Sequence, residues 1–511
     1  MLLANITERN ASFYGDRTAM VSGPTRISFR EFNSRVNSLT NALSQLGVNK
    51  GDKVILMTES CHQSIEVVFA GIKGGVVISA INPNLPLRDL SYLINNAEAN
   101  TVILGDNQKS QIDSIRAELK TVKNLIVIGT PQGQMKSYEE LISSSLPNEP
   151  KVEHEEGDLL FLQYSGGTTG LPKQVMHTRK SALQTTLNTI LNWRLTPGDV
   201  YLALAPPYWG QFLQLHCALI YAGCTTIFLS DINPTSILET IEKERVTISL
   251  VGGPLLPPLV DHQNTSKYNL SSLRHLSVGG VPVPPEVEEK AIETLGNVIG
   301  HLYGMTEHTF LTILHPEELA TDGSREKTKR LRSSGRAGLN IRLRIVDDNG
   351  NDVALGQVGE IITAGYGMME GYWKAPEATR EAMMGSYLCT GDLATMDEQG
   401  YVYHAGRKKD VIVTGGKTVS PTEVEELIAG HGPVQEVAVI GVPDEELGQA
   451  IKAIVVLKTR QAATEEEIIS LCQQNLPSYA VPKSAEFVDR LPRSTFGKVL
   501  RGVLREQYDK C

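Results

Sequence analysis

The stretch from Tyr164 to Val175 carries the residue types that binding of a polyphosphate would need. It places three glycines and three hydroxyl residues ahead of a lysine: Ser165, Gly166, Gly167, Thr168, Thr169, Gly170 and Lys173. Glycines let a backbone turn tightly beside a bulky anion, and successive backbone N–H groups can form an anion-binding nest. The stretch is not a Walker A loop, because Gly-x-x-x-x-Gly-Lys-Ser/Thr does not occur here. Taken alone, it is also compatible with a solvated surface loop.

Four more polar motifs follow this loop along the chain. They are Tyr303–Glu307, Tyr387–Asp392, Gly406–Asp410 and Arg493–Lys498. In this order the five motifs resemble those of the adenylate-forming superfamily, which includes acyl- and aryl-CoA synthetases, nonribosomal-peptide adenylation domains and firefly luciferase. The resemblance extends from about Ile27 to Arg501 and so covers nearly the whole chain. Five motifs in the family's order outweigh the surface-loop interpretation of the first one.

The resemblance implies chemistry on ATP, which the residue types in these motifs suit. Joining a carboxylate to a thiol is unfavourable until one carboxylate oxygen becomes a good leaving group, and an acyl-adenylate supplies that group. Transfers at phosphorus are helped mainly by positioning and by charge neutralisation. Such a site therefore needs phosphate donors, a magnesium ligand, a ribose anchor and a cation near the α-phosphate.

By resemblance, these motifs and one further glycine pair bind the nucleotide. Tyr303 is expected against the adenine, while Asp392 would accept both ribose hydroxyls and Arg407 would also reach the ribose. The expected ATP-binding set is Ser165, Gly166, Gly167, Thr168, Thr169, Gly170, Lys173, Gly279, Gly280, Tyr303, Gly304, Thr306, Asp392, Arg407 and Lys498. One position departs from the family, because Gln174 stands where a glycine usually follows the lysine.

Three residues are expected to be catalytic. Thr306 would contact the α-phosphate, and Glu307 would bind Mg²⁺, a hard ion that prefers oxygen ligands. Lys498 matches the family lysine that contacts the substrate carboxylate and the α-phosphate. The resemblance further implies that a small domain rotates between the two half-reactions, with Lys409 at the hinge position, so that Lys498 leaves and a thiol enters.

The acid pocket is expected beyond the carboxyl ends of buried strands, where ligands of open parallel sheets bind. The candidates are small residues that leave room for a flat ring and two aromatic residues in a nearby turn: Trp209, Phe212, Gly252, Gly253 and Gly279. The aromatic pair could equally be core residues beside a turn. No acidic residue that could pair with an ammonium group occurs in Tyr208–Leu215 or Val251–Leu256. An apolar acid is therefore expected, whether aromatic, alicyclic or medium-chain.

The elements that must position these motifs alternate between strand and helix. Apolar runs such as Lys53–Met57 are typical of buried strands, and His177–Asn192 after the glycine loop is expected to be helical. The alternation predicts an α/β fold of mainly parallel sheets covered by helices. We expect a large N-terminal domain at residues 1–406, a hinge at 407–410 and a small mobile α+β domain at 411–511.

Composition and charge limit the partners of the chain. It has 511 residues, of which 41% are hydrophobic and 21% charged, an ordinary globular balance. A net charge of -10 argues against a nucleic-acid partner. No apolar run is long enough to span a bilayer, and the N-terminus turns polar too early for a signal peptide. Scattered cysteines without a Cys-x-x-Cys pair fit free thiols in a reducing cytoplasm.

A run of basic residues has two interpretations. It comprises Arg325, Lys327, Lys329, Arg330 and Arg332. Most such runs are solvated loops, and the alternative is a patch that binds the phosphates of coenzyme A.

The sequence therefore predicts a carboxylic acid–CoA ligase that uses ATP, Mg²⁺ and coenzyme A and releases AMP and pyrophosphate. Alternatives are an enzyme that loads a separate carrier protein and a catalytically silent nucleotide-binding relative. Intact Glu307, Asp392 and Lys498 argue against the silent relative, and the few residues after Lys498 argue against a fused carrier domain. The sequence leaves open which acid is used and whether the chain forms a homodimer.

Overall fold

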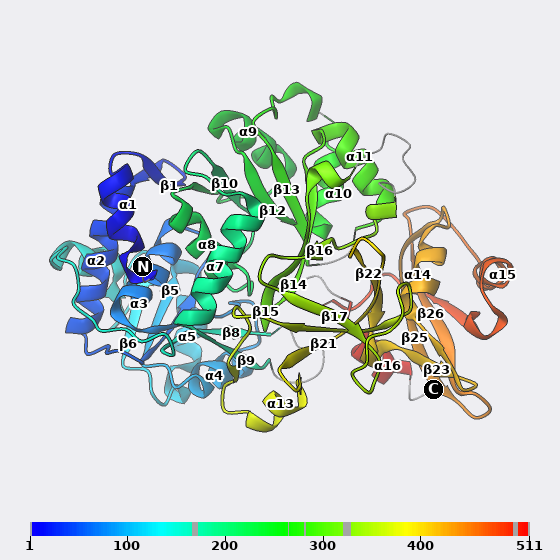
Figure 1. Cartoon of the computed structure of the whole chain (residues 1–511). Coiled ribbons are helices and arrows are strands. Elements are labelled where there is room, and N and C mark those ends of the chain that lie inside the picture. The colour runs from blue at the N-terminus through cyan, green and yellow to red at the C-terminus, as the bar shows by residue number, and fades with distance from the viewer. Residues whose placement is uncertain are drawn as a thin grey trace. The chain divides into compact units, whose positions relative to one another are not determined.

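The computed structural model describes residues 3–165, 172–263, 265–280, 283–319, 329–493 and 499–508. These residues form two compact units. The first contains the chain up to Ser165, Pro172–Arg342 and Thr363–Leu388, and the second contains Leu343–Ile362 and the chain from Cys389 onward. Both units combine helices with sheets, which confirms the predicted α/β class (Figure 1). The predicted hinge at residues 407–410 lies inside the second unit, and the domain boundaries proposed from the sequence stay a prediction.

A nine-stranded sheet in the first unit carries the motif Tyr303–Glu307. Its order is β16-β15-β14-β13-β12-β10-β11-β1-β2. The pairs between β1 and β14 are parallel, and β2, β15 and β16 pair antiparallel at the two edges. The strands are β1 (Thr18–Ser22), β2 (Thr25–Ser28), β10 (Val200–Ala203), β11 (Thr225–Phe228), β12 (Ile248–Gly252), β13 (His275–Gly279), β14 (Ile299–Met305), β15 (His308–Leu314) and β16 (Arg336–Ala337).

An eight-stranded sheet in the same unit carries the two ends of the glycine loop. Its order is β19-β9-β8-β4-β3-β5-β6-β7, parallel from β8 to β7 and antiparallel at β9 and β19. The strands are β3 (Lys53–Met57), β4 (Val77–Ala80), β5 (Thr101–Gly105), β6 (Asn124–Ile128), β7 (Lys136–Ser137), β8 (Leu159–Tyr164), β9 (Gln174–Thr178) and β19 (Gly371–Tyr372). Two mainly parallel sheets with helical connections agree with the alternation in the sequence.

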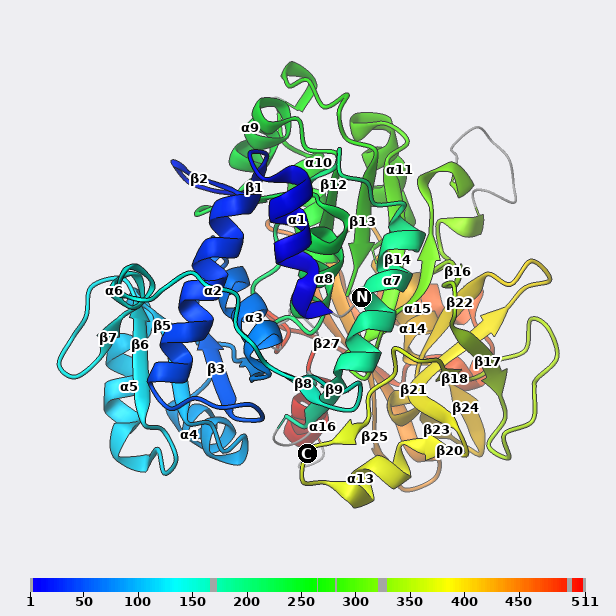
Figure 2. The same ribbon diagram turned by 60° about the vertical axis from the view of Figure 1, so that its left-hand side comes forward.

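The main helices of the first unit are α1 (Ile6–Tyr14), α2 (Phe29–Gln45), α3 (His62–Gly74), α4 (Leu87–Asn96), α5 (Lys109–Ile115), α6 (Tyr138–Ser144), α7 (Arg179–Trp193), α8 (Phe212–Ala222), α9 (Pro234–Glu244), α10 (Leu256–Val260), α11 (Pro285–Leu295) and α13 (Pro376–Glu381). Helix α2 begins with a capping box in which Ser28 and Glu31 satisfy each other's backbone N–H groups. Its apolar residues recur at helical spacing and bury one face, and α3 packs beside it (Figure 2).

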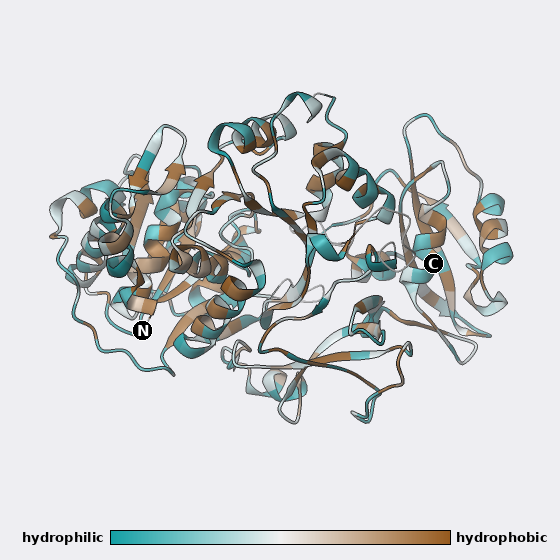
Figure 3. Ribbon diagram, turned by 45° about the horizontal axis from the view of Figure 1, so that its top comes forward, coloured by the Kyte–Doolittle hydropathy of each residue, from teal (hydrophilic) through white to brown (hydrophobic). Residues whose placement is uncertain are grey.

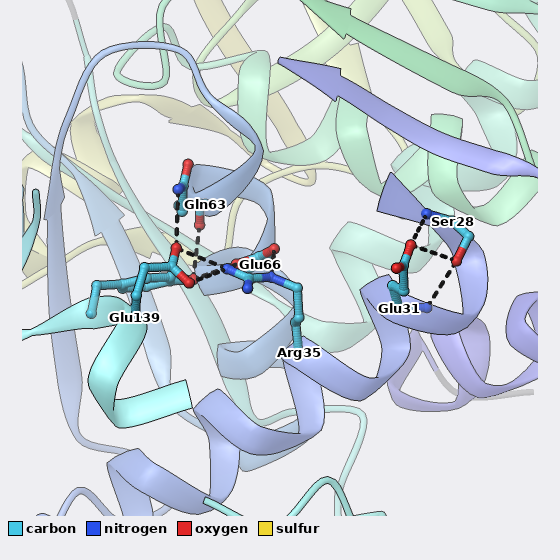
Figure 4. A network of polar contacts seen from close by, with 7 residues as sticks. Ser28, Glu31, Arg35, Gln63, Glu66 and Glu139 are labelled. Carbon is cyan, nitrogen blue, oxygen red and sulfur yellow. Dashed lines mark hydrogen bonds and ion pairs between the residues drawn. The ribbon is translucent and has the colours of Figure 1, made fainter. Parts of the chain in front are cut away.

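A buried charge network fastens α2, α3 and α6 together (Figure 4). Glu66 on α3 is fully buried, and burial raises the pKa of its carboxyl group. Arg35 donates to it at 2.6 Å, and the Tyr138 hydroxyl donates to its second oxygen at 2.8 Å. Arg35 also pairs with Glu139 at 2.9 Å. Because every buried charge here has a partner, the network supports the fold rather than a reaction.

The remaining elements form a sheet around β21 and a smaller α+β region, and all of them except β20 lie wholly or mostly in the second unit. The order of the first sheet is β17-β18-β21-β20, with β22 also pairing β21, and a three-stranded sheet has the order β25-β26-β27. The elements are β17 (Arg342–Val346), β18 (Gly359–Ala364), β20 (Met383–Met384), β21 (Tyr387–Met396), β22 (Val402–Arg407), β23 (Ile412–Thr414), β24 (Lys417–Val419), α14 (Pro421–Ala429), β25 (Val434–Asp444), β26 (Gly448–Leu457), α15 (Glu465–Asn475), β27 (Ser484–Phe487) and α16 (Arg501–Tyr508).

Apolar residues concentrate along the strands, where Figure 3 shows brown, while many helices show teal on part of their surface. In the first unit the two largest clusters of buried apolar side chains include Val54, Ile78 and Phe161 in one and Ile55, Val102 and Leu162 in the other. Neighbouring residues of the same strands thus enter different clusters, as expected for strands buried on both faces. Among the described residues, no helix has both the length and the apolar content needed to cross a bilayer.

Candidate active site

The residues that the structure describes stop at Ser165 and resume at Pro172, at the two ends of the glycine loop. Gly166, Gly167, Thr168, Thr169 and Gly170 lie outside them, as does Lys498. Ser165 follows β8, and Lys173 precedes β9. The Ser165 backbone N–H donates to the Lys173 carbonyl oxygen at 3.0 Å, and the Ser165 hydroxyl donates to the same oxygen at 3.4 Å. These bonds hold the entry and exit of the predicted phosphate loop together.

Gln174, which replaces the family's usual glycine, fills a buried polar position. Its side chain is 2% exposed, donates to the Tyr164 hydroxyl at 2.8 Å and accepts from the Asn96 amide at 2.6 Å. The Trp373 indole N–H donates to the Asn96 carbonyl oxygen at 3.0 Å. The departure from the family pattern therefore adds bonds that fix the loop's exit to Tyr164 on β8 and to Asn96 on α4.

Thr306 and Glu307 occupy the tight connection between β14 and β15, and Glu307 is only 6% exposed. The Tyr372 hydroxyl donates to Glu307 Oε1 at 2.8 Å. Lys173 Nζ lies 4.7 Å from the centroid of the Tyr372 ring. Burial, together with the charge of Glu307, raises the pKa of Tyr372, so the phenol keeps its proton and remains a donor. Lys173 and Glu307, predicted from separate motifs, thus contact one side chain.

His177 is a supporting residue that the sequence did not reveal, because it was expected in the helix after the loop. That prediction was wrong at its start: β9 runs to Thr178, and α7 begins at Arg179, with the Thr178 hydroxyl accepting from the Ser181 N–H. His177 is fully buried, and its Nε2 lies 2.8 Å from the Thr306 carbonyl oxygen. Burial lowers the pKa of His177 to about 4. The neutral ring must carry its proton on Nε2, because a carbonyl oxygen can only accept.

Two of the predicted nucleotide-binding glycines, Gly304 on β14 and Gly279 on β13, leave no room for a side chain. A Cβ at Gly304 would lie 2.7 Å from the Phe310 backbone nitrogen, and one at Gly279 would lie 2.9 Å from the Leu302 carbonyl oxygen. Tyr303 is half-buried on β14, and its backbone pairs with Thr312 on β15. The close backbone approach explains both glycines without a ligand. Gly280 differs, because its φ of +85° favours glycine and a Cβ there would meet open space.

The predicted acid-pocket residues separate into two environments. Trp209 lies over the backbone of Gly252, where a Cβ would be 3.0 Å from the indole Cη2. Phe212 is 1% exposed at the start of α8 and packs on His216 with 4.0 Å between ring centroids. Gly253 begins a short 3₁₀ turn after β12. The geometry therefore brings Trp209 to Gly252 and leaves Phe212 in the core.

Gly210 packs against the turn at Thr306, next to the predicted acid-pocket residue Trp209. A Cβ at Gly210 would lie 2.8 Å from Thr306 Oγ1, so only glycine lets the two segments pack this closely. The Gln163 amide donates to the Gly210 carbonyl oxygen. Gln163 belongs to β8, directly before the glycine loop. Neither Gly210 nor Gln163 could be identified from the sequence, because neither belongs to one of the five motifs.

In the second unit, Asp392 and Arg407 face each other on β21 and β22, as their backbone register requires. Arg407 Nε donates to Asp392 Oδ1 at 2.6 Å, with 39% of the arginine side chain and 14% of the aspartate side chain exposed. The two residues predicted at the ribose are thus neighbours. A carboxylate with an arginine beside it keeps its negative charge and a defined orientation.

The predicted hinge residue lies between two anchored neighbours. Lys408 Nζ lies 3.0 Å from Glu360 Oε2, and Arg505 donates to Asp410 at 2.8 Å. Lys409 is exposed between them, although partial burial and the nearby Arg407 lower the pKa of its ammonium group. The hinge role of Lys409 stays a prediction.

The donor set fits a magnesium ion that arrives with phosphate. No group of three or more His, Cys, Asp or Glu side chains gathers among the described residues, so these do not build an all-protein metal cage. Mg²⁺ is usually bound by one or two carboxylates together with substrate phosphates. Glu307, a buried carboxylate beside the hydroxyl residue Thr306, matches that requirement.

Of the basic run, Arg325 and Lys327 lie outside the described residues, whereas Lys329 and Arg332 are exposed. Arg330 donates to the Glu318 carbonyl oxygen at 3.3 Å. These positions suit either interpretation of the run, a solvated loop or a phosphate patch.

Comparisons with known proteins agree on one family. The model of the AMP-binding enzyme family matches residues 7–373, and that of the AMP-binding enzyme C-terminal domain matches residues 423–498. A long-chain-fatty-acid–CoA ligase of Escherichia coli O157:H7 is 30% identical over 99% of this chain and 94% of its own length. A feruloyl-CoA synthase of an Amycolatopsis species is 30% identical over 98% of both chains.

Solved structures agree as well. ATP-bound MatB from Rhodopseudomonas palustris superposes with a TM-score of 0.90 at 28% identity and covers 100% of this chain and 99% of its own. The anthranilate CoA ligase AuaEII in complex with anthranoyl-AMP superposes with a TM-score of 0.89 at 28% identity, over 100% of this chain and 98% of its own.

Proposed function

Since the chain belongs to the AMP-binding enzyme family and is an acid–thiol ligase of the acyl-CoA synthetase type, we propose that it joins an apolar carboxylic acid to coenzyme A through an acyl-adenylate. In the first step a carboxylate oxygen attacks the α-phosphorus of ATP, and pyrophosphate leaves with the electrons of the broken P–O bond. In the second step the thiol sulfur attacks the acyl carbon, its proton passes to solvent, and AMP leaves.

The observation that carries this proposal is the meeting of Lys173 and Glu307 at Tyr372. A cation and an anion from separate motifs are thereby held near one another at the exit of the predicted phosphate loop. Transfer at phosphorus needs both charges, one for the phosphate oxygens and one for a metal ion. The presence of both charges at one position therefore supports a phosphate-binding role for the loop.

We assign the remaining roles in the first step from the same family pattern. Glu307 would hold Mg²⁺, which when bound neutralises phosphate charge and favours departure of pyrophosphate. Thr306 contacts the α-phosphate, and its carbonyl is held by His177. Tyr303 lies against the adenine, the Asp392–Arg407 pair binds the ribose, and Lys498 contacts the attacking carboxylate and the α-phosphate.

An apolar acid is supported by the composition of the acid side. The Trp209 indole packs on Gly252, Leu302 lies beside Gly279, and no acidic residue occurs in Tyr208–Leu215 or Val251–Leu256. The relatives named above are ligases for long-chain fatty acids, ferulate and anthranilate. We propose an aromatic, alicyclic or medium-chain acid. We also propose a cytoplasmic location, which the free thiols of the described cysteines support.

A screen of acids tests this function. Acid-dependent exchange of pyrophosphate into ATP would be measured over aromatic, alicyclic and medium-chain acids, and AMP release would be measured with and without coenzyme A. We expect exchange with at least one acid and a thioester product only when coenzyme A is present. Exchange without any thioester would instead favour loading of a separate carrier protein, and no exchange with any acid would contradict the proposed first step. Light scattering of the same preparation decides between a monomer and a homodimer.

A further inference from the structure

A short segment of the first unit, residues 369–373, contacts both the exit of the glycine loop and the turn that carries Glu307. Its strand β19 pairs antiparallel with β9, Gly371 with Met176 and Tyr372 with Val175. The Trp373 N–H donates to the Gln174 carbonyl oxygen at 2.8 Å, next to Lys173. The segment is therefore fixed to the strand that leaves the glycine loop.

The same segment is fixed to the turn that carries Glu307. The Met369 N–H donates to the Glu307 carbonyl oxygen at 2.8 Å. Three residues later the Tyr372 backbone N–H donates to Thr379 Oγ1 at 2.9 Å, which ties β19 to the start of α13. With its backbone held on three sides, Tyr372 has little freedom to move away from Glu307.

The Tyr372 side chain contacts Glu307 through its hydroxyl group and Lys173 through its ring. The hydroxyl donates a hydrogen bond to Glu307 Oε1 at 2.8 Å, and Lys173 Nζ lies over the ring, 4.7 Å from its centroid. Tyr372 is 8% exposed and Glu307 6% exposed, so water competes little for the hydrogen bond. The hydroxyl orients a carboxylate, and the ring orients an ammonium group.

We propose that Tyr372 is a positioning residue for the metal–nucleotide complex, with its hydroxyl setting Glu307 for Mg²⁺ and its ring setting Lys173 for phosphate. This inference rests on the proposed function, because it needs Glu307 as the metal ligand. Partners that orient a metal-binding carboxylate commonly change metal affinity by roughly 10–100-fold when they are removed. The two contacts are separable by substitution, because phenylalanine keeps the ring and removes only the hydroxyl.

The experiment measures nucleotide binding by calorimetry on the full chain, without acid, in the presence of Mg²⁺ and again with chelator. Tyr372→Phe should weaken ATP binding with Mg²⁺ by roughly 10–100-fold and leave ATP binding in chelator at the parent value. Tyr372→Leu should weaken binding under both conditions, because it also removes the ring beneath Lys173. Thermal unfolding of each variant shows whether it is folded.

Tyr366 provides the matched control. It lies six residues earlier in the same unit, and its ring also faces a lysine, with Lys180 Nζ 5.4 Å from the centroid. It is 68% exposed, and the lysine over its ring is Lys180 rather than Lys173. Tyr366→Phe and Tyr366→Leu should leave ATP binding unchanged under both conditions.

Two outcomes would overturn the inference. Parent-like binding of Mg²⁺ and ATP by Tyr372→Phe would show that the hydroxyl does not set Glu307, and equal losses with and without Mg²⁺ would show a structural role only. Glu307→Gln separates this result from the function itself. If Glu307→Gln loses the Mg²⁺-dependent part of binding while Tyr372→Phe keeps it, only the inference fails. If Glu307→Gln also keeps it, the proposed metal site fails.

Discussion

Two buried neutral side chains hold the residues of the Thr306–Glu307 turn. His177 donates to the Thr306 carbonyl oxygen and Tyr372 donates to the Glu307 carboxylate, each at 2.8 Å. Because both donors are uncharged, they orient the turn without cancelling the charge of Glu307. A preorganised anion of this kind is what a phosphate-bound metal ion requires.

Lys498 provides the first prediction at this scale. By resemblance it acts on the carboxylate and the α-phosphate, so it belongs to the first half-reaction only. Lys498→Ala should slow adenylation by roughly 10²–10³-fold, as is typical for removal of one donor to the transition state. Thioester formation from supplied acyl-adenylate should continue at the parent rate. Single-turnover measurement of each half-reaction checks this, and an equal loss in both would contradict the assignment.

At the scale of elements, the antiparallel pair β8 and β9 brings the ends of the glycine loop together. Strand β19 pairs with β9 at the edge of the sheet. Asn96, at the end of α4, donates to the side chain of Gln174, the first residue of β9. The loop's exit is therefore held by a helix and two strands. Gln174 is the residue through which these contacts pass.

Replacement of Gln174 by glycine, the family's usual residue, tests how much these contacts stabilise the loop's exit. Gln174→Gly should lower the free energy of unfolding by about 1–3 kcal/mol, because Asn96 and Tyr164 would lose buried partners. Glycine adds up to about 1 kcal/mol through backbone entropy. Urea unfolding measures the loss. Gln174→Met serves as the control for volume, since it fills the space without the bonds, and stability equal to the parent in both variants would show that the bonds contribute nothing.

At the scale of the whole molecule, several histidines are buried in neutral form, and this makes stability depend on pH. Burial lowers the pKa of His216 to about 4 and that of His275 to about 3. Unfolding returns each ring to an ordinary value of about 6.5. Below about pH 6.5 the unfolded chain therefore binds more protons, and stability should fall as the pH drops toward about 4.

Urea midpoints at about pH 7.5, 6 and 5 measure this loss. His216→Leu should reduce the slope between the two lower values, because it removes a ring whose pKa rises on unfolding. Loss of the bond from His216 Nδ1 to the Phe212 carbonyl oxygen should lower stability at every pH and leave the slope unaffected. An unchanged slope in His216→Leu would mean that this ring does not contribute to acid sensitivity.

The proposed change between half-reactions is also a property of the whole molecule. Lys498 must be near the acyl group in the first step, and the thiol must approach it in the second. Lys409 lies between Lys408 and Asp410, both of which are held by ion pairs. Because proline fixes φ and disfavours helical conformation in the residue before it, Lys409→Pro should restrict rotation there.

We expect Lys409→Pro to exchange pyrophosphate near the parent rate but to form thioester far more slowly, with the adenylating arrangement retained. Lys409→Ala is the control, since it removes the charge and keeps the backbone free. Both half-reactions would be measured on one preparation of each variant. Thioester formation at the parent rate in the proline variant would show that Lys409 is not the pivot.

The sequence by itself determined the family and the α/β class, and it predicted the nucleotide-binding residues. Motif order and the alternation of strand and helix are local properties, and local patterns record which residues are apolar and where the chain turns. They also recorded the departure at Gln174, although not what its side chain contacts.

The tertiary structure decided which side chains meet. Tyr372 reaches Glu307 and His177 reaches Thr306 across 65 and 129 residues of sequence. Periodicity carries no information about such distant partners, because they depend on which strands become neighbours and in what register. The same limit applies to Phe212, because the sequence did not reveal that its ring packs on His216.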